Sequence, residues 1–129
     1  MGLAELDRIT TLLTDYLDVQ SRRAEIVASN LANADTPDYK AKKVEFDEYL
    51  RNAVRAAVAP RNTVQGPAST DSLRVVEQDD LVPGIDGNNV STEREMATLA
   101  ETGGKFMTGT QLLQMRFRTL RAAIKEGRG

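Results

Sequence analysis

The chain has 129 residues, a formal net charge of −2, 40% hydrophobic and 5% aromatic residues, and no histidine, cysteine or tryptophan. Without cysteine there are no disulfides and no thiol nucleophile, and without histidine the commonest general base and neutral metal ligand are missing. The near-neutral charge is not typical of a nucleic-acid-binding domain, which is usually basic. The four prolines lie between residues 37 and 83, which leaves a proline-free arm at each end of the chain.

The N-terminal arm, residues 1–36, is predicted to be one long helix from about Leu3 to Ala34. Apolar residues recur at steps of three and four, which places them along one helix face. The helix should end before Thr36 and Pro37, because a residue that precedes proline is pushed out of the helical region. The apolar seam of this arm comprises Leu6, Ile9, Leu13, Tyr16, Val27 and Leu31.

The connecting region, residues 37–89, has weaker patterns. Helical spacing predicts a short amphipathic helix at about residues 46–58. Residues 59–85 are predicted to be a flexible loop, because they are rich in turn-forming residues. Within this loop, residues 73–76 fit either a short strand or a merely extended segment.

The C-terminal arm, residues 90–129, is predicted to be a second long helix. It begins with a sequence that fits a capping box, with Thr92 as the N-cap and Glu95 reaching back to it. Gly103 and Gly104 interrupt it at a cost of about 1 kcal/mol each relative to alanine, which indicates a bend or a close approach by another backbone. A heptad-like seam comprises Met96, Leu99, Phe106, Leu113, Phe117, Leu120 and Ile124.

Two long amphipathic helices pair most simply as an antiparallel hairpin. The predicted fold class is therefore all-α: the arms form a coiled-coil-like hairpin around an irregular middle, together one elongated domain. Such a hairpin buries only one face of each helix and gains little against chain entropy. We therefore expect a subunit of an assembly, which folds fully only on polymerising and buries its seams against its own or neighbouring helices.

The two arms differ in charge, since residues 1–36 are net acidic and residues 84–129 are net basic. Two explanations fit this difference. The charges compensate the helix dipole, or the opposite arms attract each other within or between molecules. No nucleotide-binding or nucleophile motif occurs, and Asp86–Asn89 fails as a calcium loop because the fifth position is Val90. We predict no catalytic, metal-binding or cofactor-binding residues, and no enzyme.

The segment Ala28–Lys40 is more elaborate than a helix end requires. Asparagines at positions 30 and 33 can bond freed backbone groups, and Tyr39 can turn its ring inward and its hydroxyl outward. The segment closely resembles the N-terminal signature of the bacterial flagellar axial proteins, the family of rod, hook and hook-associated proteins. The matching residues are Ser29, Asn30, Leu31, Ala32, Asn33, Asp35, Thr36, Pro37 and Tyr39.

One position departs from this signature: Asp38 replaces a glycine of the family pattern. A positive φ there would cost aspartate more than glycine, although aspartate tolerates it better than most residues. Asn30, Asn33 and Thr36 are expected to close the helix end and to hold the connecting turn.

In its short length and in the sequence of its C-terminal arm, the chain is similar to the proximal rod members of this family. The resemblance implies helices that line an axial channel, helical stacking into the torque-transmitting rod that crosses the periplasm, and export by the flagellar type III pathway without a cleaved signal peptide. It also implies partners: further copies of the chain, the proximal rod protein FlgC, the junction protein FliE, the membrane-ring protein FliF and the export apparatus. Neither a cofactor, nucleic acid nor membrane insertion is expected.

Two alternatives stay open from the sequence. One is the sister proximal rod protein FlgC. The other is a soluble coiled-coil adaptor or flagellar export chaperone, which would bind a partner helix and stay in the cytoplasm. Secretion by a strain that lacks the rest of the rod would distinguish the rod subunit from the adaptor.

Overall fold

The computed structural model describes residues 3–60 and 73–127, and the side chains of residues 3–7 and 57 lie outside the described part. The predicted seam residue Leu6 and residues 61–72 of the predicted loop therefore fall outside it.

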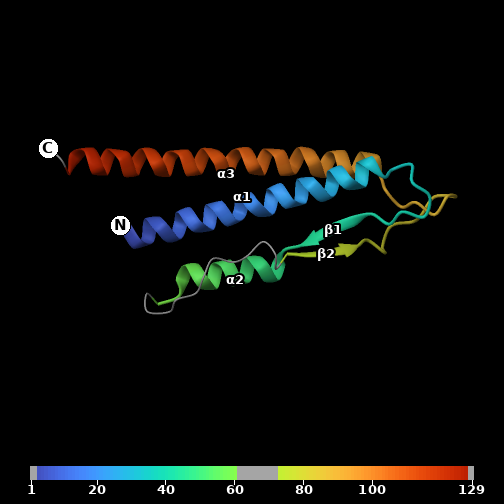
Figure 1. Ribbon diagram of the computed structural model, residues 1–129, viewed down its shortest axis with the longest axis horizontal. Helices are drawn as coiled ribbons and strands as arrows, with labels where there is room; N and C mark the ends of the chain where they lie inside the picture. Colours follow the sequence, from blue (N-terminus) through green and yellow to red (C-terminus); the bar gives the residue numbers. More distant parts are fainter. Residues whose placement is uncertain (1–2, 61–72, 128–129) are drawn as a thin grey trace.

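Two long helices dominate the structure, as predicted. Helix α1 spans Leu3–Ala32 and helix α3 spans Thr92–Glu126. They run side by side in opposite directions, with the two chain ends at the same end of the molecule (Figure 1). The predicted antiparallel hairpin of the two arms is thus confirmed.

The connecting region holds a short helix and a two-stranded antiparallel ribbon. Helix α2 spans Asp47–Val58, in agreement with the helix predicted at about 46–58. Strand β2, Arg74–Glu77, lies where a strand or an extended segment was expected. Its partner β1, Lys42–Glu45, was not predicted, because its four residues carry no apolar alternation beyond Val44.

The ribbon register places unlike charges opposite each other at both ends. Lys42 pairs with Glu77 and Glu45 pairs with Arg74, while Val44 and Val75 face each other between them. Opposite charges and branched apolar residues are both favourable cross-strand neighbours. This pairing supports a ribbon that would be marginal in isolation.

Helix α1 forms the middle layer of the molecule. Helix α3 lies on one side of it, and α2 with the ribbon lies on the other (Figure 1). The buried apolar cluster sits on the second side, so the main core lies between α1 and the connecting region rather than between the two long helices. Its members are Val19, Ile26, Val44, Tyr49 and Leu73, with Phe46 and Val75 packed against them.

The residues that α3 buries against α1 are either small or polar, not large and apolar. Its buried residues are Glu95, Thr102 and Gly109, which recur every seven residues and so lie on one helix face. The predicted seam of this helix is displaced from that face by one position along much of its length. Five of its members are 39–60% exposed in the single chain: Met96, Leu99, Phe106, Phe117 and Ile124.

Other seam residues are better covered. Val27 is buried, and Ile9, Leu13, Tyr16 and Leu31 of α1 are half-buried. Leu113 and Leu120 of α3 are also half-buried. The single chain therefore covers the described part of the α1 seam and leaves much of the α3 seam available to other molecules.

The close approach of the two helices occurs at Gly109. A Cβ added there would lie 2.8 Å from Leu17 Cδ2 and 3.1 Å from the Tyr16 ring. At Gly103 and Gly104 a Cβ would meet nothing within 4 Å among the described residues, and α3 runs through both without interruption. The close backbone approach that the glycine pair indicated is thus absent at that pair within the described chain.

The start of α3 corrects the predicted capping box. Ser91, not Thr92, is the N-cap, and its hydroxyl oxygen accepts a hydrogen bond from the Arg94 backbone N–H at 3.4 Å. The third residue of the helix is then Arg94, which cannot accept the return bond that a glutamate would accept. A cap displaced by one residue leaves Glu95 free to turn into the buried face.

Substitutions at Gly109 and Gly104 should have opposite effects on the free energy of unfolding. We expect Gly109→Leu to destabilise the hairpin by about 1–3 kcal/mol, because the new side chain must displace Leu17 and Tyr16. Gly104→Leu should instead stabilise it by somewhat less than about 1 kcal/mol, through helix propensity in open space. Urea unfolding followed by circular dichroism measures both, and equal effects of the two substitutions would contradict the assigned approach.

Candidate functional site

The end of α1 is joined to the ribbon by the side chain of Asn30, which is fully buried. Its Nδ2 donates to the Lys42 carbonyl oxygen at 2.7 Å, and its Oδ1 accepts from the Lys42 N–H at 2.9 Å. One primary amide thus bonds both backbone groups of a strand residue, as a neighbouring peptide would. The Tyr39 hydroxyl also donates to Asn30 Oδ1, at 3.3 Å, so this hydroxyl turns toward the junction rather than outward as expected.

Asn33 and Thr36 close the helix end itself. Asn33 Nδ2 donates to the carbonyl oxygen of Ser29, one turn earlier, at 2.8 Å. The Thr36 hydroxyl donates to Asn33 Oδ1 at 3.1 Å. The Ser29 carbonyl also accepts the Asn33 backbone N–H at 3.1 Å, so the Asn33 amide adds a second bond to the last turn of the helix.

Asn88 and Asn89, for which the sequence predicted no role, complete the junction. Asn88 Nδ2 donates to the carbonyl oxygens of Asn33 and Thr36, both at 2.8 Å. Asn89 Oδ1 accepts from the Ala41 N–H at 2.6 Å, while its Nδ2 donates to the Gln78 carbonyl oxygen at 2.7 Å. Asn88 Oδ1 also accepts from the Val90 N–H at 2.8 Å, a local bond typical of a turn asparagine. The Nδ2 groups of Asn88 and Asn89 bond backbone outside the turn, which no local pattern predicts. We call the set Asn30, Asn33, Asn88 and Asn89 the asparagine junction.

Asp38 and Gly87 bring the two loops of the junction into contact. Asp38 has a φ of 59° and Gly87 a φ of 80°, so both occupy the left-handed region. The positive φ considered for Asp38 is therefore present. The Asp38 N–H donates to the Asp86 carbonyl oxygen at 2.9 Å, and a Cβ on Gly87 would collide with Asp38 Oδ1. Both its conformation and this contact favour glycine at position 87.

The remaining signature residues lie at the surface or are only partly covered. Leu31 is half-buried, and the exposed members are Ser29, Ala32, Asp35, Thr36 and Pro37. Their pattern shapes the turn, while the asparagines make the bonds across it.

Replacing Asn30 should cost more than replacing Asn33. Asn30→Ala leaves the part-buried Lys42 N–H without its partner and removes a donor from the Lys42 carbonyl, and an unsatisfied buried group costs about 1–3 kcal/mol. Asn33→Ala removes bonds at a half-buried position, so we expect a loss below about 1 kcal/mol. Denaturant unfolding of the two matched variants checks this order, and a larger loss for Asn33→Ala would contradict the role given to Asn30.

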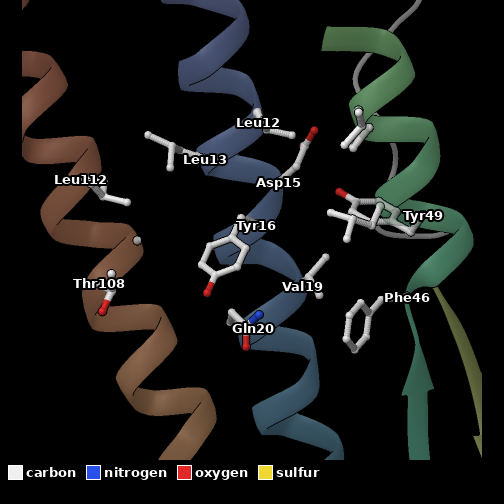
Figure 2. Close-up of a pocket in the computed structure, with 14 residues that line it drawn as sticks. Leu12, Leu13, Asp15, Tyr16, Val19, Gln20, Phe46, Tyr49, Thr108 and Leu112 are labelled. Carbon is white, nitrogen blue, oxygen red and sulfur yellow. The ribbon is translucent and has the colours of Figure 1, made fainter. Parts of the chain in front are cut away.

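A second feature is an apolar cleft of about 350 Å³ between the three helices (Figure 2). Helix α1 forms its floor with Leu12, Leu13 and Tyr16. Tyr49 on α2 and Leu112 on α3 form the opposite walls. A cleft of this size lies at the lower end of those that bind small molecules or inserted side chains.

A buried carboxyl group lies in the wall of this cleft. Asp15 is 8% exposed, and burial, followed by the charge of Asp18, raises the pKa of its carboxyl above the ordinary value of 3.8. Tyr49, at 3% exposed, has its pKa raised to about 12 by burial and then by the charge of Asp15. Tyr49 therefore stays neutral at physiological pH, and its hydroxyl donates a hydrogen bond to Asp15.

The raised pKa of Asp15 makes the folded chain pH-dependent. The protonated carboxyl fits the folded state better, so its stabilisation is complete below pH 3.8 and is lost as the pH rises through the raised pKa. Asp15→Asn keeps an acceptor for Tyr49 without the charge. We expect this variant to melt at a higher temperature than the parent at pH 7.

The difference in melting temperature between Asp15→Asn and the parent should shrink as the pH falls toward 3.8. Asp80→Asn, which removes an exposed carboxylate outside the helices, is the matched control. A difference in melting temperature that stays the same between pH 7 and pH 4 would contradict the raised pKa of Asp15.

In the part of the chain that the structure describes, no cluster of three or more potential carboxylate ligands could hold a metal ion. Across the helices of that same part, none is long and apolar enough to cross a membrane. What the described residues offer is a hydrogen-bonded polar junction, an apolar cleft and an exposed apolar helix face, which are features of an assembling protein.

Comparison with known proteins gives consistent matches. Residues 17–40 match the family described as "Flagella basal body rod protein". A flagellar basal body rod protein FlgB from Cereibacter sphaeroides is 33% identical over 84% of this chain and 88% of its own length. The FlgB proteins of Salmonella typhimurium and Yersinia enterocolitica are 29% and 28% identical, each over 97% of this chain and 99% of their own length.

Proposed function

Because this chain belongs to the FlgB family of flagellar basal body rod proteins, we propose that it is a structural subunit of the proximal rod, polymerising helically to transmit torque and to line the export channel. The family is structural, so the chain is not an enzyme. Among the alternatives, the sister protein FlgC loses its support, since the relatives described above are FlgB proteins.

The observation that carries the proposal is the extent of the match. FlgB relatives align over 97% of this chain and 99% of their own length, so the similarity includes both helical arms and the region between them. The structure adds a physical reason for assembly. Large apolar side chains such as Met96, Phe106 and Phe117 are exposed along α3, and monomeric proteins rarely expose extended apolar surface of this kind.

We also propose the setting and the partners of this subunit. It would be exported by the flagellar type III pathway without a cleaved signal and would lie in the periplasmic part of the basal body. Its neighbours would be further copies of itself, FlgC, FliE, FliF and the export apparatus. The two arms and the connecting region 37–89 would act as one elongated domain, held together by the asparagine junction.

The adaptor or export-chaperone alternative makes a different prediction about location. A rod subunit is secreted and then recovered in purified basal bodies, whereas an adaptor stays in the cytoplasm. Quantifying the chain in both fractions therefore separates the two functions.

Charge on the α3 seam should prevent assembly. We expect Leu113→Asp and Phe117→Asp each to abolish swimming and incorporation into basal bodies, because a carboxylate cannot be buried in an apolar helix contact without a partner. Gln114→Asp, at an exposed neighbouring position, should swim normally. Swimming plates and blots of basal bodies measure both, and normal swimming of the two seam variants would refute the seam assignment.

A further inference from the structure

The cleft between α1, α2 and α3 has the character of a docking site. Its wall is almost wholly apolar (Figure 2). Its rim carries Leu50, Val54 and Leu112, each 46% exposed. The rim residues contribute little burial of apolar surface to the single chain, since about half of each side chain faces water. An apolar side chain inserted between them would remove this surface from water.

Two acceptors in the cleft add a polar requirement. Asp15 supplies a carboxylate, and Gln20, at 4% exposed, has a buried Oε1 without a hydrogen-bond partner among the described residues. A buried acceptor without a donor costs free energy, so an occupant that brings a donor is favoured. Since the described residues that line the cleft include no lysine or arginine, the matching occupant is apolar and carries a cation.

The chain itself carries a segment of this composition. Residues 113–125, which do not line the cleft, contain no acidic residue and four cations, Arg116, Arg118, Arg121 and Lys125. Phe117 of this segment is 43% exposed. Arg121 follows it by four residues, so both project from the same helix face, and a guanidinium offers five donors.

We propose that the cleft of one copy binds this end of α3 from a second copy, with Phe117 packed on the apolar wall and Arg121 donating to Asp15 and Gln20. The inference rests on the proposed function, because it names the contact through which copies of the chain polymerise. The cleft and the end of α3 are different surfaces of one chain. A contact between unlike surfaces repeats from copy to copy and builds an open helical filament rather than a closed dimer.

Site-specific cross-linking tests the contact directly. The chain has no cysteine, so Leu50→Cys with Lys125→Cys introduces one thiol at the cleft rim and one beside Arg121. Basal bodies from cells with this double variant are treated with a short bismaleimide. We expect a ladder of covalent oligomers at least tenfold stronger than from the control pair Leu50→Cys with Glu93→Cys, which carries its second thiol at the other end of α3.

The outcomes separate the inference from the proposed function. Absence of the parent chain from basal bodies refutes the rod function. Presence of the chain with a ladder no stronger than the control overturns the docking contact and leaves the rod function standing. Cross-linking of the thiol introduced at position 50 to a protein of another mass shows that the cleft binds a different partner, which also overturns the inference.

A second measurement covers a double variant that fails to assemble. The two cysteines are then placed on separate co-expressed chains, each of which carries a single substitution. A heterodimer that needs both thiols supports the contact. Efficient cross-linking that persists after Arg121→Gln and Phe117→Ala are combined would contradict it.

Discussion

The structure depends on one hydrogen-bonded pair of groups: the side-chain amide of Asn30 and the backbone of Lys42. A helix end and a strand start do not bond each other through their backbones in this geometry, and polar groups would be left unpaired beside a buried side chain. The amide resolves this by acting as an extra peptide group. Asn88 and Asn89 extend the same solution to the loop before α3, so the positions of α1, the ribbon and α3 are set together.

The packing of the single chain is unevenly distributed. The apolar cluster around Tyr49 and Val19 joins α1 to the connecting region, while the contact of α1 with α3 uses Thr102 and Gly109. Small residues let two helices approach closely but bury little apolar area. The apolar face of α3 is consequently left outside. For a rod subunit this arrangement leaves apolar surface that assembly partners can cover.

Buried polar groups next to the apolar cleft serve specificity more than stability. Asp15 raises the cost of folding at neutral pH, and the lone Oε1 of Gln20 adds to it. Hydrophobic side chains at both positions would produce a more stable chain with a less selective surface. The acceptors favour a cationic occupant and disfavour a purely apolar one, which limits non-specific association.

The sequence by itself determined the two long helices, the short helix, the hairpin and the family signature, because these follow from local periodicity, proline positions and a short motif. It also placed Asn30, Asn33 and Thr36 at the helix end. Only the tertiary structure decided which face of α3 meets α1, that Gly109 rather than Gly103 is the close approach, that Ser91 is the cap, and that Asn88 and Asn89 close the junction. The buried and the exposed faces of α3 differ by one residue in register, and the Nδ2 groups of Asn88 and Asn89 bond backbone outside their own turn. Local patterns carry neither kind of information, since both depend on where a distant segment lies.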